Sequence, residues 1–393
     1  MKDFVLEGNR YLIGNYARYP VSFVRGEGVY LYDTEGKRYL DMLAGIAVNT
    51  LGHSHPELSK VICQQASKLI HTSNLFHIQP QIDAAKILVE NSCLDKVFFC
   101  NSGAEANETA IKLVRKYFYD KGQPEKFEII TFTGGFHGRT IGSLTATAQP
   151  KYHEGFKPLL QGIRYAEFNN IKSLRESLSK NIAAVMFEFI QGEGGINLID
   201  EKFLNEIKKI SEERDLLIVV DEVQTGIGRT GKLFAYQHYD LCPDIITLAK
   251  GLGGGVPIGA VMAKDEIAKA FTPGTHGSTF GGNFLATSAA KVVLKNVLSE
   301  GFLKDVEEKG EYLKEKLKKI GIDPRGKGLM IGSTLPEKIN AGELAKRCLE
   351  NGLIVGTAGG NTLRLVPPLI ITKSQIDEGI EILSEVVKQM HID

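Results

Sequence analysis

The sequence predicts an α/β protein in which a large domain with a mostly parallel sheet is followed by a smaller α+β domain. Between about residue 84 and residue 250, short apolar runs alternate with helical patterns, which is typical of βαβ units. The apolar runs are nearly continuous, as expected for strands that are buried on both faces. After about residue 283 long helical patterns take over, which indicates a second unit. A length of 393 residues leaves room for two or three such units.

The expected elements follow one another along the chain. Before the alternating region, residues 24–41 predict two strands around a turn at residues 33–36, and Pro56 ends a loop that leads into a helix. The alternating region predicts helices from residue 101 and over 201–214, and strands over 97–100, 128–133, 183–187, 216–220 and 244–250. The last part predicts helices over 283–300 and 303–320, strands near 328–334 and 362–366, and a final helix from Ser374, where Ser374 and Asp377 have capping-box spacing. We therefore expect residues 1–44 to form an N-terminal segment that packs with the small domain, 45–284 to form the large domain, and 285–393 to form the small domain.

The overall composition excludes several classes of protein. Lys plus Arg and Asp plus Glu both number 47, which argues against a nucleic acid or an anionic membrane as the main partner. The five cysteines are widely spaced and form no C-x-x-C motif, so we expect a reducing compartment, no disulfide framework and no zinc site. The first residues lack the apolar region of a signal peptide, and no apolar run approaches the ~20 residues of a membrane span. These features predict a cytoplasmic protein.

Each predicted strand of the alternating region ends in a polar or aromatic group. The residues that follow these strands are Ser102, Phe136, Glu188, Asp221 and Lys250. Ligands of parallel sheets bind at the carboxyl ends of the strands. We therefore expect these five residues to converge on one rim of the sheet.

Three of these groups together predict a pyridoxal 5′-phosphate site. Ser102 and Glu105 have capping-box spacing at a helix start, and free N–H groups at a helix N-terminus bind phosphate. Asp221 ends a buried strand and could keep a pyridinium nitrogen protonated. Lys250 ends the next strand, and a desolvated lysine has a depressed pKa and can form a Schiff base. Alone, Lys250 could equally be a surface lysine where a strand leaves the core.

Two other motifs suggest sites that their surroundings do not support. His53 and His55 are two residues apart, but no further Cys, His, Asp or Glu cluster has the spacing of a metal site, and a structural loop is the favoured interpretation. The segment Gly226–Gly231 matches G-x-G-x-x-G and, with Lys232, nearly matches a Walker A loop. Leu233 stands where Walker A needs Ser or Thr, and the following residues do not predict the helix of a dinucleotide site.

The chain resembles the class III aminotransferases, which are pyridoxal-phosphate enzymes of fold-type I. The resemblance covers nearly the whole chain and is carried by several motifs in order. They are Gly45-Ile-Ala-Val-Asn49, Leu51-Gly-His-Ser-His-Pro56, Asn101-Ser-Gly-Ala-Glu-Ala-Asn-Glu108, Phe136-His-Gly-Arg-Thr140, Asp221-Glu-Val-Gln-Thr-Gly226, Ala249-Lys-Gly-Leu-Gly-Gly-Gly255 and His276-Gly-Ser-Thr-Phe-Gly-Gly-Asn283. Two positions depart from the family pattern, because Phe189 and Phe284 stand where the family usually has proline. Neither departure replaces a chemical group.

The resemblance implies roles for individual residues. Lys250 would carry the cofactor as a Schiff base and shuttle a proton, and Asp221 would pair with the pyridinium. The other cofactor contacts would be made by Ser102, Gly103, Ala104, Phe136 on the ring face, His137, Val223, Gln224 at the ring hydroxyl and, from the neighbouring subunit of a homodimer, Thr279. The substrate would be bound by Arg139, Glu193, Ser278 and Arg364.

Arg364 and Glu193 would divide the work of recognising two substrates. A guanidinium binds a carboxylate through two parallel hydrogen bonds, so Arg364 would take the α-carboxylate of glutamate or 2-oxoglutarate. In relatives, a glutamate at the position of Glu193 masks this arginine when a donor presents its distal amine. A surface ion pair is the alternative role for Arg364.

Within the family, the motifs most resemble those of the acetylornithine aminotransferases. The expected reaction moves the ω-amino group of N2-acetyl-L-ornithine to 2-oxoglutarate and yields N-acetylglutamate 5-semialdehyde and glutamate, as in arginine biosynthesis. Alternatives are ornithine, succinylornithine, 4-aminobutyrate or aminoadipate-semialdehyde transamination, and an isomerase of the glutamate-1-semialdehyde mutase kind. A more distant alternative is a nucleotide-dependent oxidoreductase that uses residues 226–231. The sequence does not define the acyl group of the donor.

Overall fold

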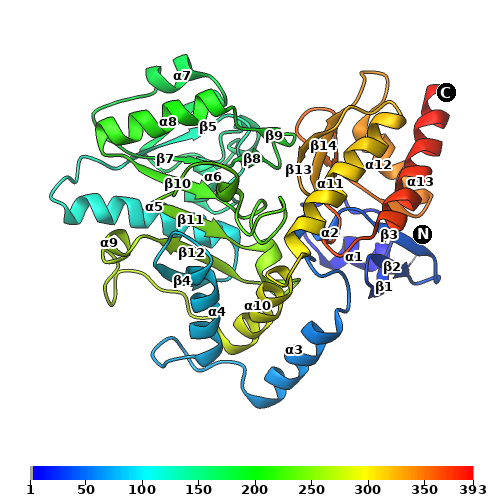
Figure 1. Ribbon diagram of the computed structural model, residues 1–393, viewed down its shortest axis with the longest axis horizontal. Helices are drawn as coiled ribbons and strands as arrows, with labels where there is room; N and C mark the ends of the chain where they lie inside the picture. Colours follow the sequence, from blue (N-terminus) through cyan, green and yellow to red (C-terminus); the bar gives the residue numbers. More distant parts are fainter. Residues whose placement is uncertain (1–2, 393) are drawn as a thin grey trace.

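The computed structural model describes residues 3–392 and divides into a large and a small body (Figure 1). The large body is built on a seven-stranded sheet in the order β4-β12-β11-β10-β7-β5-β6. Only β12 runs antiparallel to its neighbours in this sheet, so the predicted mostly parallel sheet is confirmed. The strands are β4 (Lys96–Cys100), β5 (Glu128–Phe132), β6 (Ile163–Ala166), β7 (Ile182–Phe187), β10 (Leu217–Asp221), β11 (Ile245–Leu248) and β12 (Gly259–Ala263).

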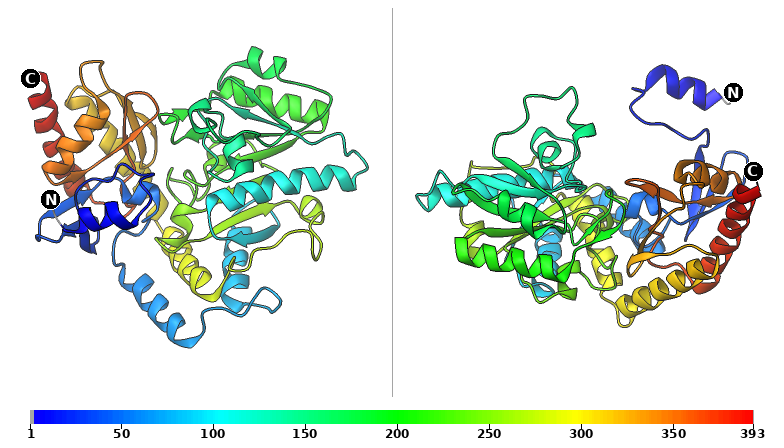
Figure 2. Two further views of the ribbon diagram at one scale, coloured as in Figure 1. Left: turned by 180° about the vertical axis from the view of Figure 1, so that it is seen from behind. Right: turned by 90° about the horizontal axis from the view of Figure 1, so that it is seen from above.

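Helices cover both faces of this sheet (Figures 1 and 2). Every residue of β10 is buried, and because side chains alternate along a strand, its residues divide between two cores. Ile218 and Val220 belong to a core shared with α8 (Glu201–Arg214). Leu217 and Val219 belong to a second core shared with α5 (Gly103–Asp120). This two-sided burial explains why the strands read as continuous apolar runs.

The helix α10 (Phe284–Val297) packs with the large body. Its buried side chains, among them Val293 and Leu294, belong to the same core as the β10 residues Ile218 and Val220. The helix contacts α3 (Pro56–Lys68) and α4 (Gln79–Glu90). The boundary proposed between residues 284 and 285 therefore falls after the first residue of a helix of the larger core, and the chain changes bodies between α10 and α11 (Phe302–Lys319).

The small body contains two sheets and its own core. One sheet has the order β13-β14-β17-β16, and the other has the order β1-β2-β3-β15. Val29, Leu40 and Met42 of the N-terminal segment belong to the core of this body, as expected for a segment that packs with the small domain. Its elements are β1 (Phe23–Glu27), β2 (Tyr30–Asp33), β3 (Arg38–Asp41), β13 (Arg325–Lys327), β14 (Met330–Thr334), α12 (Ala341–Glu350), β15 (Leu353–Ile354), β16 (Gly356–Ala358), β17 (Thr362–Leu365) and α13 (Lys373–Ile392).

The start of α13 differs from the prediction. Thr372, not Ser374, forms the reciprocal cap, because Gln375 N donates to Thr372 Oγ1 and Thr372 N donates to Gln375 Oε1. Asp377 is instead bound by the Tyr312 hydroxyl and by Lys316 of α11. Both residue pairs have the spacing of a capping box, and the tertiary contact to α11 decides between them.

The remaining elements are short. They are α1 (Asp3–Tyr11), α2 (Ala44–Ala47), α6 (Ile141–Ala146), α7 (Ile171–Glu176), β8 (Ile190–Gln191), β9 (Asn197–Leu198), α9 (Asp265–Ala268) and the 3-10 helices η1 (Pro150–Tyr152), η2 (Ala235–His238) and η3 (Lys250–Gly253). No helix between residues 3 and 392 is long and apolar enough to cross a membrane.

The cysteines contradict the expectation that the chain has no disulfide. Cys93 and Cys242 form one, with their Cα atoms 6.1 Å apart. They lie 149 residues apart in the sequence, after α4 and before β11, and only the fold brings them together. The two-histidine loop is structural, since His53 Nε2 lies 2.8 Å from Asp41 Oδ2. Within the described range, no cluster of His, Cys, Asp and Glu could hold a metal ion.

Candidate active site

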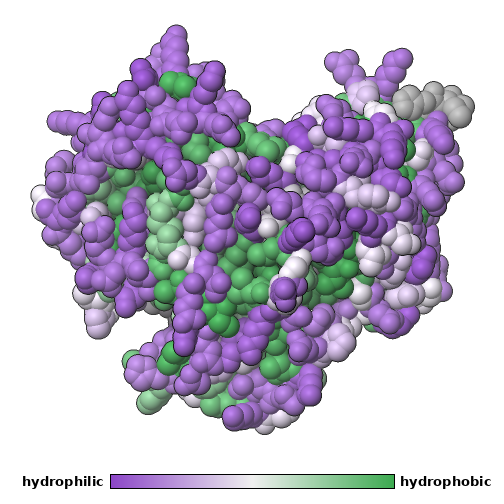
Figure 3. Space-filling view, in the orientation of Figure 1, coloured by the Kyte–Doolittle hydropathy of each residue, from purple (hydrophilic) through white to green (hydrophobic). Residues whose placement is uncertain are grey.

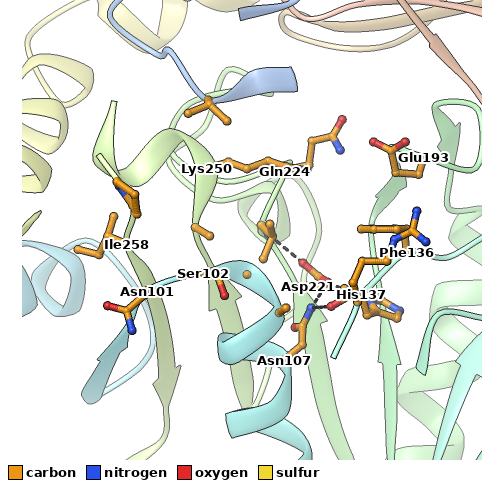
Figure 4. A pocket seen from close by; sticks show the side chains of 18 of the residues that line it. Asn101, Ser102, Asn107, Phe136, His137, Glu193, Asp221, Gln224, Lys250 and Ile258 are labelled. Carbon is orange, nitrogen blue, oxygen red and sulfur yellow. Dashed lines mark hydrogen bonds and ion pairs between the residues drawn. The ribbon is translucent and has the colours of Figure 1, made fainter. Parts of the chain in front are cut away.

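A cavity of about 430 Å³ lies at the carboxyl ends of the central strands. The residues expected at the ends of β4, β5, β7, β10 and β11 line it together. Ser102, Phe136, Asp221 and Lys250 are labelled in Figure 4, and Glu188 also lines the cavity. Val48 and the segment 255–258 contribute to the wall. Strands that neighbour one another in the sheet thus bring together residues that are far apart in the sequence.

Lys250 begins η3 immediately after β11. Its φ of 37° lies in the left-handed region, which costs a non-glycine residue on the order of 1–3 kcal/mol and is concentrated at functional sites. Burial lowers the pKa of the amine, Glu193 and Asp221 oppose that shift, and Arg364 adds to it. A lowered pKa gives more of the neutral, nucleophilic amine near neutral pH.

Asp221 at the end of β10 is held by three donors. Its Oδ2 lies 2.7 Å from His137 Nδ1 and accepts a hydrogen bond from Asn107 Nδ2 at 2.8 Å, while Oδ1 accepts from Val223 N at 2.9 Å. Burial disfavours a charged His137, but the Asp221 carboxylate outweighs this effect and the pKa of the imidazole is raised. The sequence reasoning gave Asn107 no role. A polar residue on the buried face of α5, only 1% exposed, is the signal that could have found it.

The N-terminus of α5 opens toward the cavity. The side chain of Ser102 caps it by accepting a hydrogen bond from Glu105 N at 3.2 Å, which is one half of the predicted capping box. The Glu105 carboxylate accepts from Asn101 N at 2.5 Å, not from Ser102 N. The first main-chain bond of the helix is donated by Ala106 N, so the N–H groups of Gly103 and Ala104 remain available to an anion. A Cβ on Gly103 would lie 2.8 Å from Val223 Cγ1. Glycine therefore lets the helix end approach the loop after β10.

Glu188 joins two loops on the rim. Its carboxylate accepts hydrogen bonds from Phe136 N at 2.9 Å and from Gly192 N at 3.1 Å. The first bond fixes the turn that presents the Phe136 ring, and the second fixes the turn before Glu193. Burial raises the pKa of Glu188 to about 7, partly offset by His137. The sequence placed Glu188 at this rim but assigned it no contact.

Arg364 and Glu193 form an ion pair beside the cavity. Arg364 lies on β17 of the small body, and its side chain is 4% exposed, whereas that of Glu193 is 24% exposed. Burial raises the pKa of Glu193, but the Arg364 guanidinium prevails and the net shift is downward. The Nε atom of Arg364 is buried without a hydrogen-bond partner. A carboxylate could satisfy this spare donor.

Two further expected substrate residues, Arg139 and Ser278, and the expected cofactor contact Thr279 lie at the rim of the cavity or outside it. Arg139 is exposed and lines the cavity, and its guanidinium stacks 4.0 Å from the Tyr152 ring centroid. Among the described residues it forms no ion pair. Ser278 Oγ accepts a hydrogen bond from Asn101 Nδ2 at 3.2 Å, next to the cavity. Thr279 is exposed and does not line the cavity of its own chain.

The groups around the cavity fit pyridoxal 5′-phosphate. An aspartate in a buried network, free N–H groups at a helix start and a lysine of lowered pKa surround one cavity. Gln224 Oε1 and Asn107 Oδ1 are buried without partners, which leaves polar groups for a polar ligand. Phe136 supplies an aromatic face at the wall. We propose that these residues, with His137, Val223, Ser102, Gly103 and Ala104, hold the cofactor.

Comparisons with known proteins agree with this chemistry. A family model described as aminotransferase class-III matches residues 13–387. The acetylornithine aminotransferase of Aquifex aeolicus (strain VF5) is 52% identical over 379 residues, which cover 96% of this chain and all of that protein. The solved N-acetylornithine aminotransferase of Stenotrophomonas maltophilia K279a has a TM-score of 0.86 and 36% identity, with 99% of each chain covered. An ornithine aminotransferase from Toxoplasma gondii, with partial occupancy of PLP at its active site, has a TM-score of 0.94 and 32% identity, with 99% of this chain and 94% of that chain covered.

Proposed function

The chain belongs to the class III aminotransferases, and from this premise we propose that it transfers the ω-amino group of N2-acetyl-L-ornithine to 2-oxoglutarate. It is a pyridoxal-phosphate-dependent aminotransferase of fold-type I. The products would be N-acetylglutamate 5-semialdehyde and glutamate, so that one amine and one carbonyl exchange places. We further propose that it serves arginine biosynthesis in the cytoplasm. The ion pair between buried Arg364 and half-buried Glu193, beside Lys250, carries the proposal, because Arg364 can bind the carboxylate of one substrate and stay paired with Glu193 while the other reacts.

The catalytic residues of this proposal are Lys250 and Asp221. When bound, the cofactor supplies an electron sink and a temporary acceptor for the amino group. The Lys250 amine would take the proton from the substrate carbon that bears the reacting amine. Asp221 would keep the ring nitrogen protonated, and its contacts with Asn107 and His137 fix the orientation of its carboxylate. Gln224, Gly103 and Ala104 would orient the ring and the phosphate.

The two substrates differ in where their carboxylate lies relative to the reacting carbon. In 2-oxoglutarate a carboxylate is adjacent to the reacting carbonyl, and Arg364 is the cation beside Lys250 that could bind it. In the donor the reacting amine is distal, and Glu193 would keep Arg364 paired. The remote carboxylate of the donor would then bind Arg139 at the rim, with Ser278 nearby.

The most direct test is a donor panel. N-acetylornithine, succinylornithine, ornithine and 4-aminobutyrate would each be assayed with 2-oxoglutarate, and we expect the highest kcat/KM for N-acetylornithine. Ornithine is the second candidate, because an ornithine aminotransferase is among the similar structures. We expect Lys250→Ala to abolish turnover, and normal ping-pong kinetics in that variant would refute the assignment.

We also propose a homodimer with a shared site, supported by exposed apolar side chains. The helix α1 has no buried residue and projects away from the small body (Figure 2). Apolar side chains also gather in a band across the face drawn in Figure 3. Exposed apolar patches of this kind mark interaction sites. The large exposed apolar residues of the N-terminal segment, of the segment 69–82 and beside Thr279 are Leu6, Tyr11, Leu12, Ile13, Tyr16, Tyr19, Phe23, Val24, Leu69, Ile70, Leu75, Phe76, Ile82 and Phe280.

Mixed dimers would test the sharing of the site. Thr279→Ala is expected to weaken cofactor binding, and Lys250→Ala to remove activity. If each site uses Thr279 of the partner subunit, a mixed dimer of the two variants has one native site. We therefore expect mixed dimers to recover tight cofactor binding and activity in one site. No recovery would show that Thr279 does not act across the interface.

A further inference from the structure

The loop Gly226–Gly231, which matches a nucleotide-binding pattern in the sequence, is where the large body docks on the small one. At its centre Arg229 is only 2% exposed. Its Nη1 donates hydrogen bonds to Leu329 O at 3.1 Å and to Pro367 O at 2.5 Å. The main-chain oxygen of Arg229 also accepts a bond from Leu329 N at 3.0 Å. The guanidinium therefore binds carbonyl groups of the other body, not a phosphate.

The glycines of this region have a packing role. Gly228 has a φ of 85°, and a Cβ there would lie 2.8 Å from Val297 Cγ1. Across the contact, Gly328 has a φ of 52°, and its Cβ would lie 2.5 Å from the carbonyl carbon of Thr230. A side chain at Gly328 would push the two bodies apart, whereas one at Gly228 would first meet α10 of the large body and then Leu303 of the small body at 3.1 Å. The absence of side chains at these glycines thus allows the main chains of the two bodies to come into contact.

The two carbonyls bound by Arg229 flank β17, the strand that holds Arg364, and its neighbour β14. Leu329 immediately precedes β14, and Pro367 lies two residues after the end of β17. These strands are paired, with Gly332 opposite Arg364. Arg229 therefore fixes the ends of both strands at the side that faces the large body.

The other end of the loop is fixed to the site. Residues 222–225 join the loop to Asp221, and the Glu222 carboxylate accepts bonds from Thr225 Oγ1, Ala235 N and Tyr236 N at 2.7–2.9 Å. Gly226 N donates to Glu222 O at 2.9 Å. A continuous set of hydrogen bonds thus runs from the Asp221 strand through Arg229 to the Arg364 strand.

A charged group at this place needs an explanation. Arg229 has no carboxylate within ion-pair distance among residues 3–392. Burial lowers its pKa to about 9, and the nearby Asp41 offsets only part of this effect. An apolar side chain could fill such a space without desolvating a charge. What the guanidinium adds is a directed, charge-assisted bond to two carbonyls of the other body.

We propose that Arg229 is a positioning residue that sets the place of Arg364 relative to Asp221 and Lys250, and thereby the binding of the keto-acid substrate. This inference rests on the proposed role of Arg364. It concerns mainly the half-reaction with 2-oxoglutarate, because Arg364 stays paired with Glu193 while the distal-amine donor reacts.

The test separates the two half-reactions in single turnovers, followed by the absorption bands of the bound cofactor. The variants are Arg229→Met, which removes the charge, and Arg229→Lys, which keeps it. The control is Lys309→Met, because Lys309 is also buried and donates to a nearby carbonyl, Leu369 O at 2.7 Å, while it pairs in addition with Asp305 Oδ2 at 2.6 Å. Lys309 lies on α11 of the small body and does not join the two bodies.

We expect Arg229→Met to weaken apparent 2-oxoglutarate binding about tenfold or more, since a misplacement of 1 Å can cost about a hundredfold. The amine half-reaction should change much less. Arg229→Lys should recover part of the loss, and Lys309→Met should leave the ratio of the two half-reactions unchanged. Equal losses in both half-reactions, or an unchanged ratio in Arg229→Met, would overturn the proposal.

The test remains conclusive if a variant does not fold or if the amine donor is assigned wrongly. Rates are expressed per cofactor-bound site, so a partly unfolded Arg229→Met preparation does not imitate a loss of 2-oxoglutarate binding. If Arg229→Met does not fold, Arg229→Lys supplies the ratio of the two half-reactions. A wrong donor assignment would leave the native enzyme without an N-acetylornithine half-reaction. Glutamate would then serve as the amine donor, and an unchanged 2-oxoglutarate affinity in both Arg229 variants would still refute the role of Arg229.

Discussion

Replacing Glu193 by glutamine should redirect the enzyme toward donors whose amine is adjacent to a carboxylate. In the native protein Glu193 forms an ion pair with Arg364, the cation that would bind the carboxylate of such a donor. The substitution removes the competing charge but keeps the size of the side chain. Arg364 would then offer its guanidinium, including the unpartnered Nε, to the α-carboxylate of glutamate.

The magnitude follows from the type of bond that becomes available. Hydrogen bonds to charged groups contribute about 1.5–3 kcal/mol, which corresponds to about a tenfold to a hundredfold change. We expect the second-order rate constant of the glutamate half-reaction to rise by this factor. The half-reaction of N-acetylornithine should change by less than about threefold, because its distal amine does not use Arg364. Glu193 also raises the pKa of Lys250, so the Lys250 pKa should fall further in the variant.

Stopped-flow absorbance of the cofactor with each donor alone would measure both rate constants. Glu193→Asp, which keeps the charge, is the matched control and should behave like the native enzyme. A glutamate half-reaction that is unchanged or slower in Glu193→Gln, while cofactor binding is native, would refute the view that Glu193 masks Arg364.

Three further predictions concern stability and the rim of the site. Opening the Cys93–Cys242 disulfide by a double serine substitution should lower the free energy of unfolding by at most about 5 kcal/mol, the chain-entropy value for a separation of 149 residues; equal denaturation curves with and without reductant would contradict it. Burial raises the pKa of Glu222 from 4.5 to about 7, so its contribution to stability is complete below pH 4.5 and is lost as the pH rises through about 7. The melting temperature of Glu222→Gln should therefore fall less between pH 5 and 8 than that of the native protein, and parallel curves would exclude this titration. Tyr152→Leu should raise the KM for N-acetylornithine about two- to fivefold through loss of the cation–π contact with Arg139, whereas Tyr152→Phe should not, and an equal effect of both would assign the loss to packing.

Local sequence was sufficient for the fold class and for the catalytic rim. The apolar runs of β7, β10 and β11 are continuous because both faces of these strands are buried, and that pattern alone predicts a parallel sheet. Since the carboxyl ends of such strands lie at one edge, residues that follow them had to converge. The sequence alone therefore places Lys250 and Asp221 together.

Contacts between distant segments could not be read in the same way. The strand β12 lies between β4 and β11 and is antiparallel to both. Its sequence is as apolar as those of its two neighbours, so the apolar pattern does not reveal its direction. The disulfide joins cysteines with no local motif, and the cap of α13 forms at Thr372 because α11 takes Asp377. In each case the deciding partner lies elsewhere in the chain.

The sequence by itself determined the class of chemistry, pyridoxal-phosphate-dependent transamination, because the lysine, the aspartate and the helix start that we propose to hold the cofactor are encoded by residue type at the ends of strands. Only the tertiary structure decided how the substrate residues are held. Arg364 lies on a strand of the small body, Glu193 and Arg229 lie on loops of the large one, and their relation depends on how two separate cores dock. The glycine pattern of residues 226–231 suggested a ligand, but the approach of two main chains explains it. Such an approach leaves no periodic signal in the sequence, because it depends on the shape of both surfaces at once.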